Sequence, residues 1–336
     1  MRLRLHLNEN TAGCSPAVLD ALRGLGRQDA GVYPDYDRAR GSVAECFGIP
    51  ADHVLLTNGL DEGILAAAGA AMRDRTGRVP NAVGVEPAFD MYEVCTTALG
   101  GRMVTVPLGP QFVLDTTAVR AAVTADTKIV FLANPHNPSG ISCALDDLRA
   151  LARAIAPVTL FVDEAYADFS GESLIDADTF RRLPNLVVGR TFSKAYGIAG
   201  LRAGAVIGAP ETLAPIARVI PPYSLNAWAA AALPVATADR EYRAWYLDQA
   251  AGSRALLHEA CERLGLEAWP SAANFLLVRV GPRARDIVAQ LAARGVLVRD
   301  RSRERGCAEC IRITAGLIDD TRQAVAALEE VLCAVR

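Results

Sequence analysis

The sequence of 336 residues lacks features that mark several other classes of protein. It has 35 basic and 38 acidic side chains, a near balance that argues against a nucleic-acid or membrane-surface binder. No run approaches the ~18 uninterrupted apolar residues of a membrane-spanning helix, and the N-terminal MRLRLHLNEN lacks the apolar core of a secretory signal. We therefore expect a cytoplasmic protein that binds neither nucleic acid nor membrane.

Metal-ligand patterns are also scarce. The eight cysteines are scattered singly except for Cys307 and Cys310, a C-x-x-C pair without the second pair of a structural zinc site. The pair also lacks the βαβ context of a thioredoxin-like motif. The four histidines, His6 among them, show no metal-ligand spacing. The sequence thus predicts reduced, mostly buried thiols, no metal, and histidines that are structural or solvent-facing.

Short apolar runs alternate with helical patterns between about residues 54 and 208. The runs have no in/out alternation, which is typical of strands covered by helices on both faces of a mostly parallel sheet. They predict a large, doubly wound α/β domain. Leucines at helical spacing follow Ser142, which we expect to cap that helix. The runs are HVLLT, NAVGVE, MVTVPL, KIVFLA, VTLFVDEA, NLVVGRT and GAVIG.

The pattern changes after the Pro221-Pro222 pair. An alanine-rich helical stretch comes first, followed by the apolar runs NFLLVRV, GVLVRD and IRITAG and a terminal helix. This order predicts a smaller α+β C-terminal domain. We expect an N-terminal segment over residues 1–32, a large domain over 33–222 and a small domain over 223–336.

Polar residues follow several of the apolar runs directly. Ligands of open α/β sheets bind beyond the carboxyl ends of the strands, so these residues are the candidates for a site. LTNGLDEG offers a glycine turn, FLANPHNPSG an amide, LFVDEAYADF a carboxylate and a tyrosine, and VVGRTFSK a lysine. Because Lys194 lies among small and apolar residues, its amine would be partly desolvated and nucleophilic. The best-known use of such an amine is an imine with an aldehyde cofactor.

The same residues could form a site for pyridoxal 5'-phosphate (PLP). Such a site needs a carboxylate near the pyridine nitrogen, donors to the ring oxygen and a cup for the phosphate. Asp163 supplies the carboxylate, and Asn137 and Tyr166 supply the donors. A helix that opens at the glycine turn would aim N–H groups at the phosphate. The residues of this cup are Gly59, Leu60, Asp61, Ser193 and Arg202.

Several motifs resemble those of a known family. TFSKAYGIAG, NPHNPSG, VDEAY and IRITAG are similar to the motifs of fold-type I PLP-dependent aminotransferases. The nearer match is the histidinol-phosphate aminotransferase branch, through LHLNEN, VYPDYD, NGLDEGI, ANFLLVR and GVLVRDR. The resemblance covers nearly the whole chain. It implies a homodimer with shared active sites, whose large domain binds PLP and whose N-terminal segment joins the small domain to the substrate wall.

The resemblance also implies roles for individual residues. Lys194 would hold the cofactor and move the α-proton, while Asp163 would pair with the pyridinium nitrogen and Tyr166 with the phenolic oxygen. These three count as catalytic. Phe89 would stack on the ring, and Tyr33 would reach the phosphate of the neighbouring subunit's cofactor. Arginines suit the substrate anion because a guanidinium binds a carboxylate through two parallel hydrogen bonds. The implied substrate-binding residues are Asn8, Asn137, Arg299 and Arg312.

The chain departs from this branch near its N-terminus. Members usually have an arm of some tens of residues before N-E-N, whereas only seven residues precede Asn8, and we expect the arm to be missing. The usual N-E-N-P-Y-G also continues with Thr11 and Ala12 in place of proline and tyrosine. Loss of aromatic and hydroxyl groups would widen the substrate pocket. The cofactor chemistry is therefore predicted to be that of the family, while the substrate stays open.

Several functions stay open from the sequence. The first is a ping-pong aminotransferase between a 2-oxo acid such as 2-oxoglutarate and a histidinol-phosphate-like, aromatic or specialised-metabolism amino compound. The alternative is a PLP-dependent decarboxylase or lyase of the threonine-phosphate decarboxylase type. A nicotinamide-dependent oxidoreductase would need G-x-G-x-x-G after the first strand, but the only nearby G-x-G lies at Gly24–Gly26, before the sheet. A non-catalytic binding module would have no use for Lys194 together with Asp163.

Overall fold

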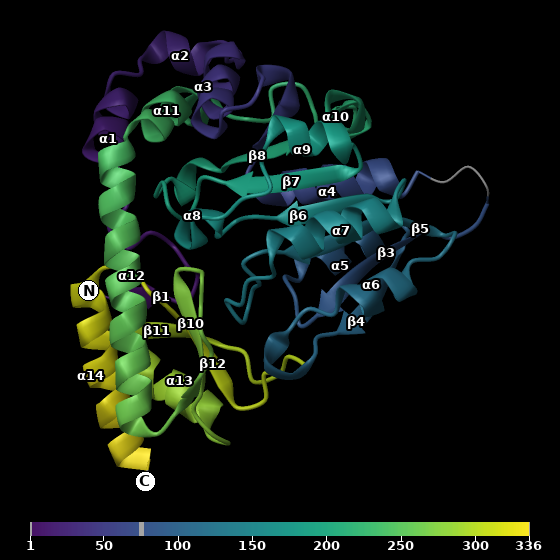
Figure 1. Ribbon diagram of the computed structural model, residues 1–336. Helices are drawn as coiled ribbons and strands as arrows, with labels where there is room; N and C mark the ends of the chain where they lie inside the picture. The colour runs from purple at the N-terminus through teal and green to yellow at the C-terminus, as the bar shows by residue number, and fades with distance from the viewer. Residues whose placement is uncertain (1, 74–76, 336) are drawn as a thin grey trace.

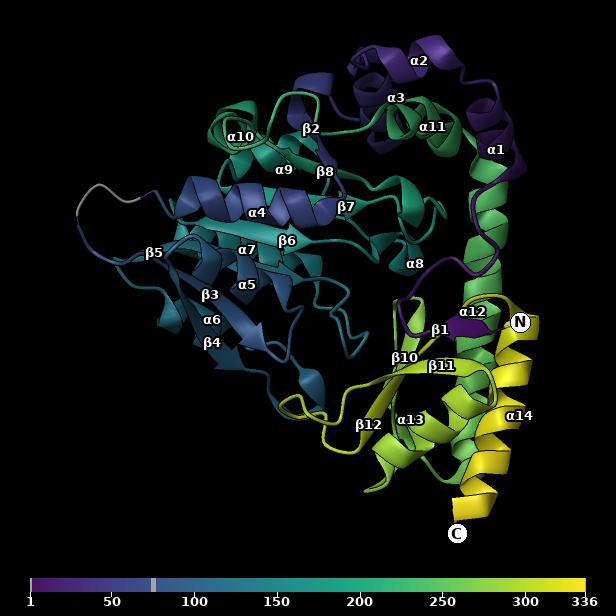
Figure 2. The ribbon, with the colours of Figure 1, turned by 180° about the vertical axis from the view of Figure 1, so that it is seen from behind.

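The computed structural model describes residues 2–73 and 77–335. It has a larger part around a seven-stranded sheet and a smaller part around a five-stranded sheet (Figure 1). The long helix α12 (Arg240–Leu264) runs past both parts, as the view from behind also shows (Figure 2). Within the described chain, no helix combines the length and hydropathy needed to cross a membrane.

The larger sheet contains all seven apolar runs that the sequence predicts as strands. Its order is β2-β8-β7-β6-β5-β3-β4, and β8 runs antiparallel to both of its neighbours. The pairs from β7 to β4 are parallel, so the predicted mostly parallel sheet is confirmed. The strands are β2 (Val54–Asn58), β3 (Asn81–Glu86), β4 (Arg102–Pro107), β5 (Thr127–Ala133), β6 (Thr159–Asp163), β7 (Leu186–Thr191) and β8 (Ala203–Gly208).

Both faces of this sheet are buried. Phe131 and Phe161 belong to the apolar cluster on one face, whereas Leu132 and Val162 belong to the cluster on the other. Neighbours along a strand point to opposite faces, which explains strands that are apolar at every position. One face packs against α4 (Leu60–Ala71), α5 (Met91–Ala98) and α10 (Pro210–Ala217). The other packs against α1 (Pro16–Arg23), α3 (Asp37–Phe47), α6 (Thr116–Ala122), α7 (Leu145–Ile155), α8 (Ala167–Ser170), α9 (Ala177–Arg182) and α11 (Ala227–Ala238).

The helix predicted after Ser142 is α7, but its cap differs. The N-cap residue is Ala144, and Ser142 Oγ is buried without a hydrogen-bond partner, so the predicted cap is wrong. The N–H of Cys143 donates to Asn134 Oδ1 at 2.8 Å. This bond holds the stretch before α7 against the preceding loop and delays the start of the helix.

The smaller sheet has the order β1-β11-β12-β10-β9 and is mostly antiparallel. Only its β1–β11 pair is parallel, and it joins the N-terminus to the C-terminal part of the chain. Apolar side chains of three helices cover the sheet, so the predicted α+β domain is confirmed. The elements are β1 (Leu3–Leu5), β9 (Glu267–Ala268), β10 (Phe275–Arg279), β11 (Val296–Asp300), β12 (Cys310–Thr314), α12, α13 (Ala284–Ala293) and α14 (Ile318–Val335).

The chain passes between the two parts more than once. Residues 6–15 lead from β1 to α1, and α11 lies beyond the predicted boundary at residue 222 yet belongs to the core of the large sheet. Tyr246 of α12 lies in that core, whereas Leu257 lies in the core of the small sheet. We propose that the boundary falls along α12. The remaining short helices are α2 (Arg27–Gly31) and the 3-10 turns at Ala51–His53, Pro110–Phe112 and Ala199–Leu201.

Candidate active site

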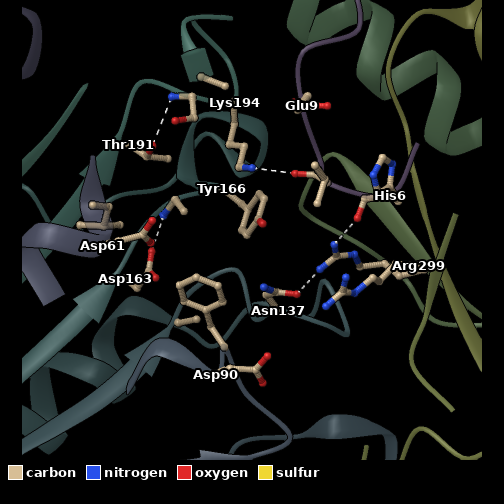
Figure 3. A pocket seen from close by; sticks show the side chains of 18 of the residues that line it. His6, Glu9, Asp61, Asp90, Asn137, Asp163, Tyr166, Thr191, Lys194 and Arg299 are labelled. Carbon is tan, nitrogen blue, oxygen red and sulfur yellow. Dashed lines mark hydrogen bonds between the residues drawn. The ribbon is translucent and has the colours of Figure 1, made fainter. Parts of the chain in front are cut away.

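A cavity of about 440 Å³ lies at the carboxyl ends of β2, β5, β6 and β7 (Figure 3). The sequence predicts that polar side chains meet at this edge. The small sheet and the N-terminal segment supply the opposite wall. The predicted site residues that line the cavity are Leu60, Asp61, Phe89, Asn137, Asp163, Tyr166, Ser193, Lys194, Arg202, Arg299 and Arg312.

Lys194 lies in the loop that follows β7. The N–H of Ser193 donates to Thr191 Oγ1 at 3.2 Å, which turns the chain directly after the strand. The amine of Lys194 donates to the carbonyl of Leu7 at 2.8 Å. The dashed line at Lys194 in Figure 3 marks this bond. The lysine on the large sheet is therefore held against the N-terminal segment, across the cavity.

Asp163 ends β6 and is buried. Its Oδ2 accepts a hydrogen bond from the Tyr92 hydroxyl at 2.8 Å, and its Oδ1 accepts one from the N–H of Ala165 at 2.9 Å. Burial raises the pKa of Asp163 to about 6, although both hydrogen bonds act in the opposite direction. No lysine or arginine in the described part of the chain forms an ion pair with Asp163. A buried acid without a cationic partner suits a ligand that brings one, such as a protonated ring nitrogen.

The amide of Asn137 has a defined orientation. Its Oδ1 accepts hydrogen bonds from Arg301 Nη2 at 3.0 Å and from Arg312 Nη1. The side-chain NH₂ group is therefore the part of the amide that can donate to a ligand. The hydroxyl of Tyr166 accepts a hydrogen bond from Asn8 Nδ2 at 2.9 Å, which leaves its own hydrogen free to donate. Two donors suited to a phenolic oxygen thus line the cavity.

Two predicted side chains lie outside this cavity lining. Asn8 is buried behind Tyr166, and its N–H donates to Thr314 Oγ1 at 3.0 Å. It therefore supports the wall of the cavity from behind. Tyr33 is 75% exposed and stacks on Tyr223 with 4.3 Å between the ring centroids. Within its own chain Tyr33 does not line the cavity.

The predicted phosphate cup lies at the start of α4. Gly59 has a φ of 76°, and a Cβ there would lie 2.5 Å from the guanidinium of Arg202. Arg202 Nη2 pairs with Asp61 Oδ2 at 2.8 Å. Because Gly59 has no side chain, the arginine approaches the turn where the first N–H groups of α4 point outward. These donors fit a phosphate group, and with Asp163 and Lys194 they fit PLP.

Three arginines form the wall opposite the sheet. Arg299 and Arg312 are paired neighbours on β11 and β12, and Arg301 follows directly after β11. The Nε atoms of Arg301 and Arg312 are buried and have no hydrogen-bond partner. Burial lowers the pKa of Arg312 to about 10, and the neighbouring arginines add to this effect. Buried guanidinium groups with unused N–H donors fit an anionic ligand.

Sequence reasoning missed eleven residues of the cavity lining, among them Arg301, Tyr92, His6 and Glu9. Arg301 lies two residues after Arg299, so the strand period of two could have placed both on one side. Tyr92 lies three residues after Phe89, in the first turn of α5, and its ring meets that of Phe89 edge to face. His6 lines the cavity, and its Nδ1 is buried without a hydrogen-bond partner.

The C-x-x-C pair lies outside the cavity. Cys307 and Cys310 are buried in a small apolar cluster that also contains Phe112, Trp269 and Leu277. Burial raises the pKa of the Cys307 thiol to about 12, which makes it a poor nucleophile. Both are free thiols, so the prediction of buried thiols is confirmed for this pair. Among the described residues, no cluster of possible ligands could hold a metal ion.

A large parallel sheet with a smaller α+β part, and a lysine, a buried acid and an anion-binding wall between them, define a fold-type I PLP-dependent enzyme. The sequence profile described as aminotransferase class I and II matches residues 2–328. The chain belongs to this family. It is a PLP-dependent aminotransferase, as the sequence motifs predict.

Comparison with individual proteins shows which members of the family this chain resembles. The histidinol-phosphate aminotransferase of Symbiobacterium thermophilum is 36% identical over 335 residues, which cover 98% of this chain and 90% of that protein. The histidinol-phosphate aminotransferase of Sinorhizobium meliloti, solved in complex with pyridoxal-5'-phosphate, matches with a TM-score of 0.90 at 28% identity, over 100% of this chain and 92% of that one. The L-threonine-O-3-phosphate decarboxylase of Porphyromonas gingivalis matches with a TM-score of 0.83 over 98% of this chain and 99% of that one. At 22% identity, this match shows a shared fold alone.

Proposed function

We propose that the protein transfers an amino group, in two half-reactions, between an anionic amino compound and a 2-oxo acid such as 2-oxoglutarate. One observation carries the proposal: Lys194 and Asp163 face the same cavity as Arg312. In a two-step transfer the donor and the acceptor use one site in turn, so both need an anionic group for the arginines. The relatives named histidinol-phosphate aminotransferase make histidinol phosphate the first donor to examine.

The residues at the sheet edge would perform the chemistry. PLP, when bound, supplies an electron sink for the charge that remains after a substrate Cα loses its proton. Lys194 would hold the cofactor covalently and, once released, carry that proton. Asp163 would keep the ring nitrogen protonated. The NH₂ of Asn137 and the hydroxyl of Tyr166 would donate to the phenolic oxygen.

The remaining residues would hold the cofactor and the substrate in place. Phe89, which lines the same cavity, would stack on the ring. Arg299 and Arg312 would bind the carboxylate or phosphate of each substrate, with Asn8 holding Tyr166 from behind. The phosphate cup would consist of Leu60, Asp61, Ser193 and Arg202.

A second copy of the chain would complete the site. Val32, Tyr33 and Tyr223 are 66%, 75% and 52% exposed, which is unusual for large apolar side chains. A two-fold interface would cover them and bring Tyr33 to the partner's phosphate cup. The molar mass from sedimentation equilibrium tests whether the chain forms this dimer. Mixing Lys194→Ala and Tyr33→Ala protomers should restore one intact site in each hybrid, and no recovery would argue against a shared site.

Single-turnover absorbance measurements test the reaction. Holoenzyme mixed with histidinol phosphate should convert its cofactor to the pyridoxamine form and release the oxo product, and 2-oxoglutarate should reverse the spectral change. Release of CO₂ without this conversion would instead indicate the decarboxylase alternative. Conversion by aromatic amino acids but not by histidinol phosphate would move the proposal to another donor. A protein that stays colourless with PLP would contradict the proposal altogether.

A further inference from the structure

Tyr92 contacts both Asp163 and Phe89 at the cofactor end of the cavity, which is the end where the PLP ring would bind. It is 1% exposed, and its hydroxyl donates to Asp163 Oδ2 at 2.8 Å. Its ring stacks on Phe131 with 5.2 Å between centroids and an interplanar angle of 1°. The rings of Tyr92 and Phe89 meet edge to face, with 5.8 Å between their centroids and an interplanar angle of 84°. Aromatic packing on two sides therefore fixes the direction in which the hydroxyl points.

The Tyr92 hydroxyl favours the ionised form of Asp163. Burial raises the pKa of this carboxyl group, and the negative charge of Asp61 acts in the same direction. The Tyr92 hydroxyl, the N–H of Ala165 and the positive charge of Lys194 act against it. Burial also raises the pKa of Tyr92, so this group stays a donor. Among the side chains that face Asp163, Tyr92 is thus the uncharged one that favours the anion.

The hydrogen bonds also fix the plane of the carboxylate. Tyr92 holds one oxygen from α5, and the N–H of Ala165 holds the other from the turn after β6. With both oxygens held, the remaining lone pairs of Asp163 keep a fixed direction in the cavity. A ring nitrogen would find its acceptor already in place, without reorientation at the moment of reaction.

We propose that Tyr92 is a positioning residue that keeps Asp163 anionic and oriented toward the ring nitrogen of the cofactor. The inference rests on the proposed role of Asp163 and adds a residue that acts through it. Tyr92 would therefore affect the rate of proton removal from the substrate more than the affinity for the substrate.

The first test uses the protein without cofactor. Tyr92→Phe keeps the ring and its stacking partners and removes only the hydroxyl. Carboxyl ¹³C signals of labelled aspartate are titrated, and the Asp163 signal is assigned by its loss in Asp163→Asn. We expect the titration of Asp163 to move up by about one pH unit in Tyr92→Phe. An unchanged titration would overturn the inference even if the enzyme proved to be an active aminotransferase.

A matched variant controls for the loss of a buried hydroxyl. Tyr196 is also buried, and its hydroxyl accepts a hydrogen bond from Arg243 Nη1 at 2.7 Å, outside the cavity lining. Tyr196→Phe should leave the titration of Asp163 in place. Equal shifts in both variants would mean that general loosening, and not the bond to Asp163, causes the effect.

The second test uses the holoenzyme. Tyr92→Phe should slow the half-reaction about tenfold with little change in KM, since the lost bond is to a group that meets the cofactor. In an Asp163→Asn background the same change should have almost no further effect, because the two side chains act as one unit. Additive effects would contradict the inference. A parent protein that never binds PLP would contradict the proposed function and leave the titration as the test of the contact.

Discussion

The two ends of the cavity, the cofactor end around Asp163 and the substrate end around Arg301 and Arg312, differ in how many of their polar groups already have hydrogen-bond partners. At the cofactor end, both oxygens of Asp163 accept hydrogen bonds, and the donors come from elements that pack on one sheet. At the substrate end, the buried Nε atoms of Arg301 and Arg312 have no partner. Buried donors in folded proteins are normally paired, so unpaired ones mark a place where an anionic ligand can bind. The proposed catalytic residues thus lie at one end of the cavity, and the proposed substrate-binding residues lie at the other.

The ends also differ in the chain segments that form them. The cofactor end uses strand ends of a single sheet, whereas the substrate end combines β11, β12 and residues 6–9 with the large sheet. A shift between the two parts would therefore move the arginines relative to Lys194. Changes at the cofactor end should alter rates, and changes at the substrate end should alter affinities. The following predictions test this division.

The largest effect is expected for Lys194→Ala. Loss of the amine removes both the attachment of the cofactor and the carrier of the proton, so turnover should fall roughly 10⁴-fold or more. The fold should persist, because Lys194 lies in the cavity lining and its amine donates to a single backbone carbonyl, that of Leu7, among the described groups. Circular dichroism and single-turnover absorbance measure the two outcomes. Turnover within tenfold of the parent would remove Lys194 from the mechanism.

Asp163→Asn should have the next largest effect on rate. An amide cannot keep a ring nitrogen cationic, so proton removal should slow by about 10²- to 10³-fold while KM changes little. Stopped-flow absorbance of the half-reaction gives both parameters. A variant that turned over at the parent rate would show that the acid serves another purpose.

The same change has a second, opposite consequence for the protein without cofactor. The pKa of Asp163 is raised to about 6, so its contribution to stability is present at low pH and is lost as pH rises toward that value. Asp163→Asn should therefore raise the free energy of unfolding at about pH 8 by roughly 2–3 kcal/mol, with little gain at about pH 4. Asp168, which pairs with Arg190 at 2.8 Å, is the matched control: its Asn variant should lose stability at the higher pH.

The division between the two ends also explains which features the sequence could predict. Asp163, Asn137 and Lys194 follow apolar runs, and the carboxyl ends of parallel strands meet at one edge, so their meeting was predictable. His6 became visible only in the structure, because its place depends on how β1 pairs with β11 across nearly the whole length of the chain. Such pairing leaves no local pattern.

Arg312→Lys should change affinity more than rate. A lysine cannot form two parallel hydrogen bonds with one carboxylate, so KM for acidic substrates should rise about 10- to 100-fold. The cofactor spectrum should stay unchanged, since Arg301 still donates to Asn137. Arg299→Lys, at an exposed position, should show a smaller increase under the same steady-state measurement. An equal loss of kcat would mean that Arg312 also positions the reacting atoms.

The smallest effect is expected at Arg301, the arginine whose charge already has a partner. Its guanidinium pairs with Glu304, so Arg301→Gln leaves an unpaired carboxylate beside the anion wall. KM for an acidic substrate should rise up to about tenfold, and Arg301→Gln with Glu304→Gln should return it to within about threefold of the parent.

Measurements of KM at different pH values distinguish two causes of this effect: the unpaired charge of Glu304 and the loss of direct hydrogen bonds from Arg301 to the substrate. Arg301 lowers the pKa of Glu304 while burial raises it, so loss of the arginine lets Glu304 take up a proton more readily. The KM penalty of the single variant should then shrink as the pH is lowered, and the double variant should show no such trend. A penalty that does not change with pH would mean that Arg301 binds the substrate through direct hydrogen bonds, and that Glu304 only holds it in place.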